Sequence, residues 1–181
     1  MLNSPPMASA APAHVIDALN GLLEAEVNSV FRTINEGSPY LSRATAEVRL
    51  PLSECGRLSR QHAQELADLI DSLGGTPMPR QMPRMEDQYL AYLSLKFLLP
   101  KLVMEKELIL RRYENAKRAI GPAFPQVIQQ LDRITAEQQE YLDALKKAAS
   151  DATGGRYNKP AGRNGNSAVS TDNSDAGPTP Q

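Results

Sequence analysis

Apolar residues recur along this chain every three or four positions, which is the period of an α-helix with one buried face. Four segments follow the pattern: 14–36, a second that begins between 42 and 52 and ends near 73, 86–120, and 125–149. The two-residue alternation of a half-buried strand nowhere competes with this spacing. We therefore expect an all-α protein.

Glycine and proline mark where these helices end. Residues 37–39 (Gly-Ser-Pro) stop the first helix, and residues 121–125 form a tight turn between the third and the fourth. The connection at 74–86 is longer than two adjacent antiparallel helices need, so it predicts a crossover along the bundle between the second and third helices. Pro51 leaves the start of the second helix open, and Pro100 is expected to bend the third.

The two ends of the chain differ from this helical part. Residues 1–13 contain prolines and small side chains, and residues 150–181 contain almost no large apolar side chain. Such segments bury too little surface to offset the entropy of ordering them. We expect a disordered leader at 1–13, one bundle domain at 14–149 and a disordered polar tail at 150–181.

Charge and cysteine content limit the binding partners and the cellular compartment that we expect for the protein. The 181 residues carry 20 basic and 21 acidic side chains, which gives no electrostatic reason to expect nucleic acid or an anionic membrane. No apolar run of about 18 residues is present to cross a bilayer. One cysteine and the absence of a signal-peptide pattern at the start favour a cytoplasmic protein.

Polar residues interrupt the apolar stripe of every predicted helix. They are Glu26 in the first helix, His62 in the second, Glu105 in the third and Gln138 in the fourth. Burying such groups costs free energy unless they are paired. Polar side chains at all four core-facing positions therefore indicate a polar site inside the bundle.

The spacing of these residues repeats. The separation is 33 residues from Glu26 to Ser59 and from Glu105 to Gln138. It is 36 residues from Glu26 to His62 and from Glu105 to Tyr141. The chain thus reads as two helical hairpins, each with an acidic residue on its first helix and a polar pair at i, i+3 on its second.

Three phrases carry a resemblance to a known family: LNGLLEAEV, HAQELADLIDSLGGTP and LVMEKEL. Across about residues 14–147, the chain resembles the ferritin-like superfamily, especially its bacterioferritin and rubrerythrin branch. The resemblance implies a four-helix bundle with two metal ions in its core. Such ions are held by one Glu from each of two helices and a Glu-x-x-His from each of the other two.

The resemblance assigns the ligands position by position. Glu26 and Glu105 match the two single glutamates, and His62 matches the histidine of the first Glu-x-x-His. Its partner position holds Ser59 instead of glutamate. The predicted metal ligands are therefore Glu26, His62 and Glu105.

The fourth helix departs furthest from the family pattern, because it reads Gln138-x-x-Tyr141. A phenol at 141 would either bind ferric iron or donate a hydrogen bond. A shifted register, Glu137-x-x-Glu140, would restore two carboxylates.

These ligands leave the chemistry open between three states: two iron ions, one ion, or a hydrogen-bonded polar core without metal. The first two predict a protein that binds or oxidises iron. The third predicts a non-catalytic bundle for interaction or assembly. In either case we expect a homo-oligomer, a dimer or larger, because further apolar residues remain for a second face (Tyr89, Tyr92, Leu93 and Phe97).

Overall fold

The computed structural model describes residues 11–37, 46–80 and 93–154, and all regular structure within these ranges is helical. The helices, in chain order, are α1 (Ala13–Val27), α2 (Val30–Gly37), α3 (Ala46–Ser72), α5 (Leu95–Ile120) and α6 (Pro125–Gly154). The expected all-α class is confirmed for this part of the chain.

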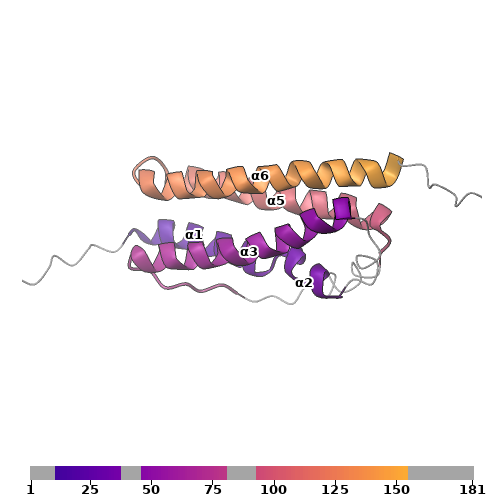
Figure 1. Cartoon of the computed structure of the whole chain (residues 1–181). Coiled ribbons are helices and arrows are strands. Elements are labelled where there is room, and N and C mark those ends of the chain that lie inside the picture. The colour runs from indigo at the N-terminus through magenta and orange to yellow at the C-terminus, as the bar shows by residue number, and fades with distance from the viewer. Residues whose placement is uncertain (1–10, 38–45, 81–92, 155–181) are drawn as a thin grey trace, which may run out of the picture.

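The four long helices pack in two layers, with α5 and α6 in one and α1 and α3 in the other (Figure 1). Contacts between α1 and α3, α3 and α6, α6 and α5, and α5 and α1 close a ring around one apolar core. α3 and α5 run in the same direction, opposite to α1 and α6 (Figure 1). Each long helix therefore presents one face to a shared interior.

The first predicted helix is broken at Asn28 and Ser29 into α1 and α2. The Asn28 side chain donates hydrogen bonds to the carbonyl oxygens of Glu24 (2.9 Å) and Arg80 (2.7 Å). Short polar side chains of this kind compete with the helical hydrogen bonds of the backbone. The break turns Ser29 into the core, where it is almost fully buried.

Residues 75–80 return along α1 after α3 ends. Asn20 Nδ2 donates to the carbonyl oxygen of Thr76 (3.2 Å), and the backbone N–H of Met78 donates to Asn20 Oδ1 (2.7 Å). The return begins very close to α1, since a Cβ added at Gly75 would lie 2.7 Å from Cδ1 of Ile16. A side chain at this position would require Ile16 or the segment itself to shift.

Two helix boundaries differ from the prediction. The helix expected from 86 begins at Leu95 in the described chain, after an extended Ser94, while residues 86–92 lie outside the described ranges. The helix expected to end at 149 continues to Gly154. Pro51 lies inside α3, so the longer version of the second helix is the observed one.

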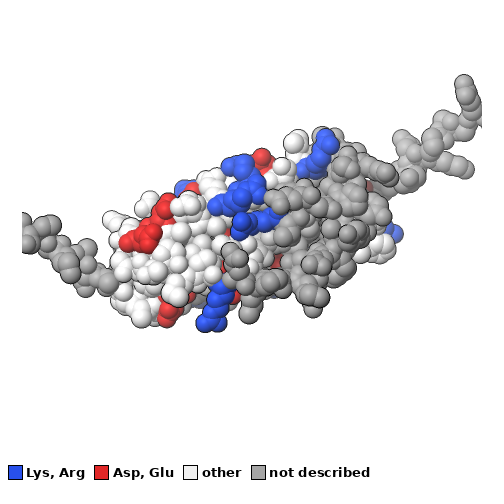
Figure 2. Space-filling view, turned by 90° about the horizontal axis from the view of Figure 1, so that it is seen from below, with Lys and Arg blue, Asp and Glu red and all other residues white. Residues whose placement is uncertain are grey.

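Viewed from the side along which residues 75–80 run, the described surface carries both signs of charge (Figure 2). Basic side chains gather near the middle of this face, and acidic ones lie toward the end at which α1 begins. No single-sign field extends across the described part of this face.

Candidate functional site

The middle of the bundle contains a cluster of buried polar side chains, with members from all four long helices. We call it the polar core. Its residues are fully or almost fully buried and comprise Glu26, Ser29, Ser59, His62, Lys106, Tyr113 and Gln138. Since burial of these groups is costly without partners, their contacts determine what the site can do.

The Glu26 carboxylate is the centre of the polar core. Its Oε1 accepts hydrogen bonds from the Tyr113 hydroxyl (2.9 Å) and from Gln138 Nε2 (2.7 Å). His62 Nδ1 lies 3.9 Å from the same oxygen. Burial, followed by the Glu26 charge, raises the pKa of Tyr113 well above its ordinary value, so this phenol stays a donor. α1, α3, α5 and α6 therefore meet at one buried anion.

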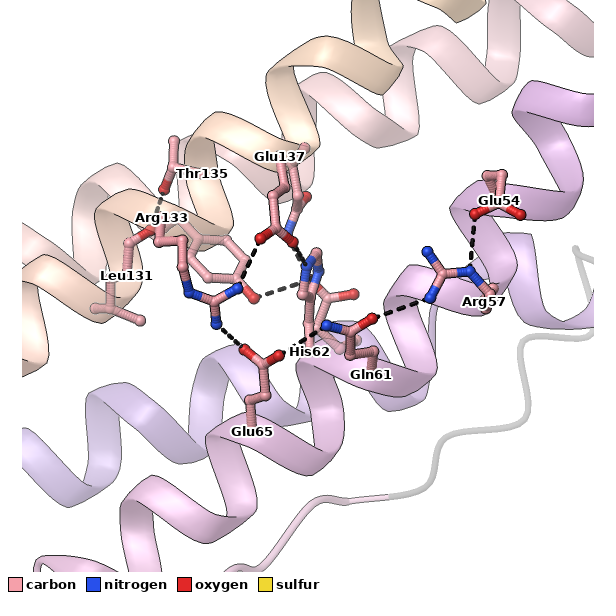
Figure 3. Close-up of polar contacts among 12 residues, drawn as sticks. Glu54, Arg57, Gln61, His62, Glu65, Leu131, Arg133, Thr135 and Glu137 are labelled. Carbon is pink, nitrogen blue, oxygen red and sulfur yellow. Dashed lines mark hydrogen bonds and ion pairs between the residues drawn. The ribbon is translucent and has the colours of Figure 1, made fainter.

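A second carboxylate reaches His62 from the surface. His62 Nε2 lies 3.1 Å from Oε2 of Glu137, and Arg133 Nη1 donates to the other Glu137 oxygen (2.6 Å). Arg133 also pairs with Glu65 of α3, so it lies between the two carboxylates (Figure 3). Because a carboxylate only accepts, Nε2 carries the proton in this contact. The imidazole thus lies between a surface ion-pair network and the buried Glu26.

The Glu137 contacts predict a pH dependence of stability. Burial acts to raise the pKa of this carboxyl, but the hydrogen bond to His62 and the charge of Arg133 outweigh it and lower the pKa below 4.5. A depressed folded-state pKa gives stability that is present above the unfolded value and is lost as pH falls through the folded one. We expect the free energy of unfolding to decrease as the pH is lowered below about 4.5, and the Glu137 contacts are one cause of this decrease.

Glu137→Gln checks this expectation. Its free energy of unfolding at neutral pH should drop by about 1 kcal/mol or less, since the pair is partly exposed. Below pH 4.5 its difference from the wild type should shrink. Urea denaturation at a series of pH values measures this, and a constant difference between the two proteins down to pH 3 would contradict it. The exposed Glu140→Gln is the matched control on the same helix.

Lys106 is the one charged base among the polar-core residues, and its side chain is fully buried. Nζ lies 5.6 Å from the centroid of the Phe31 ring. The charges of Lys106 and Glu26 both act on the Cys55 thiol, so each lies within electrostatic range of that side chain. A fixed ammonium group therefore shares the core with the buried carboxylate.

Four buried polar atoms of the described side chains have no hydrogen-bond partner: Glu26 Oε2, His62 Nδ1, Gln138 Oε1 and Lys106 Nζ. Glu26 Oε2 and Gln138 Oε1 are acceptors, and His62 Nδ1 is one when Nε2 alone carries the ring proton, whereas an ammonium group has three N–H donors and no acceptor. The unpartnered atoms are thus complementary in kind. A buried donor group and buried acceptors thus occupy one interior, and Lys106 Nζ forms no hydrogen bond with them.

Cys55 lies in the same core but offers no chemistry. Burial raises the pKa of its thiol to about 11, with a smaller opposing effect of Lys106. A thiol that stays protonated is a poor nucleophile. Cys55 therefore acts as a small apolar side chain.

Most of the predicted site residues come together, and three do not. Glu26, Ser59, His62 and Gln138 lie in the polar core, and Glu137 lies at its rim. Glu105 is half-buried and lines a hollow between α1 and α5. Tyr141 is half-buried at the edge of the apolar core, and Glu140 is exposed.

The predicted ligands Glu26, His62 and Glu105 do not form one group. Among the described residues, no three or more His, Cys, Asp or Glu side chains are placed to hold a metal ion. The position in the core that the resemblance assigns to Glu105 is occupied by its neighbour Lys106. Metal binding by this chain stays a prediction.

Tyr113, Lys106 and Ser29 are the polar-core residues that the sequence patterns did not single out. Tyr113 supplies the phenolic contact to the buried carboxylate that was considered for Tyr141. Ser29 was also missed, and its hydroxyl accepts a hydrogen bond from Ser59 (3.2 Å). Lys106 and Tyr113 lie seven residues apart in α5. A seven-residue repeat of buried positions is the sequence signal that could have identified them.

A scan of the sequence against protein-family models finds no match, and a search of curated proteins finds none. No helix in the described ranges is long and apolar enough to cross a membrane. The ferritin-like resemblance therefore rests on the residues of this chain.

Proposed function

We propose that this chain is a ferritin-like bundle that works without iron, and that it serves as an assembly or binding protein and not as an oxidase. In this proposal the ammonium group of Lys106 takes the place of a metal ion in the core. The observation that carries it is the complete burial of Lys106 in a bundle that also buries Glu26, His62 and Gln138.

Two features of the fold support the ferritin-like part. α3 and α5 run in the same direction, so the chain has to return along the bundle between them, as a long crossover does (Figure 1). Residues 76–80 start such a return alongside α1. Polar side chains from all four long helices also converge at mid-bundle, where di-iron proteins of this superfamily place their ligands.

The residue types in the core support metal independence. Two iron ions in a dry interior need about four carboxylates to balance their charge. Glu26 is the one carboxylate that is fully buried among the described residues, and Ser59 and Gln138 are neutral. In this proposal the buried Lys106 adds a positive charge to the same interior, which disfavours a bound cation and offsets the charge of one carboxylate. The side chains present do not fit a di-iron centre.

The test is the metal content of the full chain. Protein loaded anaerobically with ferrous iron and then desalted should retain less than stoichiometric iron by elemental analysis, and Glu26→Ala/His62→Ala should retain the same amount. About one or two irons per wild-type chain, lost in the double variant, would overturn the proposal. Oxygen consumption after iron addition gives a second readout, and it should match that of iron in buffer alone.

A further inference from the structure

The outward face of α5 exposes a row of large apolar side chains. Phe97, Met104 and Leu108 are 60%, 66% and 37% exposed, respectively. Their separations of seven and four residues place them on one side of the helix, away from the buried stripe. Large apolar side chains grouped on a surface commonly mark a contact site.

A hollow of about 120 Å³ opens beside this row, between α5 and α1. Its α5 wall is Glu105, Leu108, Ile109 and Arg112. The opposite wall is Glu24 and Ala25 of α1, with Asn28 and Ser29 of the break that follows α1. The four α5 residues have the spacing i, i+3, i+4, i+7. This is the arrangement that receives a projecting side chain when helices pack against each other.

We propose that this face of α5 docks a second copy of the chain about a two-fold axis that crosses the helix at the level of residue 103. Phe97 and the middle of the hollow lie about eleven residues apart along α5, or about 17 Å. A two-fold axis halfway between them places the Phe97 ring of each copy in the hollow of the other. A two-fold interface requires one surface to carry both complementary halves, and this surface does so.

Charge favours the same register. A two-fold axis near 103 brings Lys101 of one copy opposite Glu105 of the other, with Glu24 on the same rim of the hollow. Phe97 would then lie against the Arg112 guanidinium, a pairing that is favourable over an aromatic ring. The basic residue beside the projecting ring thus meets the acidic rim of the hollow.

A second copy explains this face better than an unrelated partner does. An unrelated partner with one projecting side chain would leave either the ring or the hollow unused. The inference rests on the assembly part of the proposed function and not on Lys106. A strictly monomeric chain would remove it, while the metal measurement would still stand.

Sedimentation velocity of the full chain over a range of concentrations tests the inference. The wild type should show a concentration-dependent dimer. Phe97→Glu should raise the dissociation constant by about 30-fold or more, because a ring that anchors an interface is replaced by a charge. Met78→Glu, at a 70% exposed site in the 75–80 segment and not on α5, should leave the dimer unchanged.

A cross-link keeps the test decisive if a variant folds poorly. Met104→Cys lies next to the proposed axis, where equivalent residues of the two copies come within reach of a disulfide. Under a mild oxidant it should form a covalent dimer, whereas Met78→Cys should stay monomeric, with the buried Cys55 retained in both. A monomer at all concentrations would overturn the inference. So would a dimer that Phe97→Glu leaves intact and Met104→Cys fails to cross-link.

Discussion

Replacing Glu26 with alanine is expected to lower the free energy of unfolding by about 3–5 kcal/mol, which is the usual cost of removing one partner from a buried charged network. The carboxylate accepts from Tyr113 and Gln138, and both donors lose their partner in the variant. Lys106 then remains as a buried cation without a buried anion among the described residues. Urea denaturation followed by circular dichroism at neutral pH measures the loss.

Glu26→Gln is the matched control, because it keeps an acceptor at the same place and removes only the charge. Its loss should be smaller than that of Glu26→Ala by about one hydrogen bond, or about 1 kcal/mol.

A double-mutant cycle with Lys106→Met then separates charge balance from packing. If the ammonium group compensates the carboxylate, Glu26→Gln/Lys106→Met should be more stable than the sum of the single variants predicts, by about 1–3 kcal/mol. Strictly additive effects would show that the two buried charges do not compensate each other.

The helices themselves could be predicted because each has one continuous apolar stripe. Leu98, Leu102, Ile109 and Ile120 of α5 are all buried, as their spacing requires. The break between α1 and α2 could not be predicted, because it depends on Asn28 bonding to the carbonyl of Arg80, 52 residues away. A competing side chain is visible in a sequence, but the distant group that it bonds to is not.

For the third helix, the sequence pattern predicted Glu105 as the polar residue in the core, whereas Lys106 is the fully buried one. The reason is that the two are neighbours in the sequence. Glu105 and Lys106 are adjacent, and both lie three or four residues from Leu102 and Ile109. Only a seven-residue repeat distinguishes the buried Lys106 from Glu105. Leu99, Lys106, Tyr113 and Ile120 follow one another at intervals of seven, and all four are buried. The same repeat explains why Tyr113 is the tyrosine in the polar core.

The partners of the other polar residues were predictable only in part. Glu26, Ser59, His62 and Gln138 were expected inside because each interrupts an apolar stripe, and all four are buried. Which cation balances Glu26 is a property of the packed interior, since it requires residues of separate helices to be placed together. A charged residue on one stripe cannot indicate whether its counter-charge is an ammonium group or a metal ion.

Replacing Lys106 with glutamate is expected to make the bundle dependent on a metal ion. Without metal, the variant places a second carboxyl group in the interior that holds Glu26, and the free energy of unfolding should fall by about 3–5 kcal/mol. With metal, two carboxylates, His62 Nδ1 and Gln138 Oε1 offer the oxygen and nitrogen donors that divalent iron or manganese accepts. The substitution thus exchanges the cation that the core uses.

Thermal unfolding with and without Mn²⁺ measures this exchange. Metal at 100 times its dissociation constant should return about 2.7 kcal/mol to Lys106→Glu, and its melting temperature should rise with concentration. Wild type and Lys106→Met should not respond, because the first keeps its ammonium group and the second gains no carboxylate. A wild type that Mn²⁺ stabilises as much as Lys106→Glu would mean that the lysine side chain yields its place to the ion. The unpartnered atoms Glu26 Oε2 and His62 Nδ1 would then be ligands of a functional metal site.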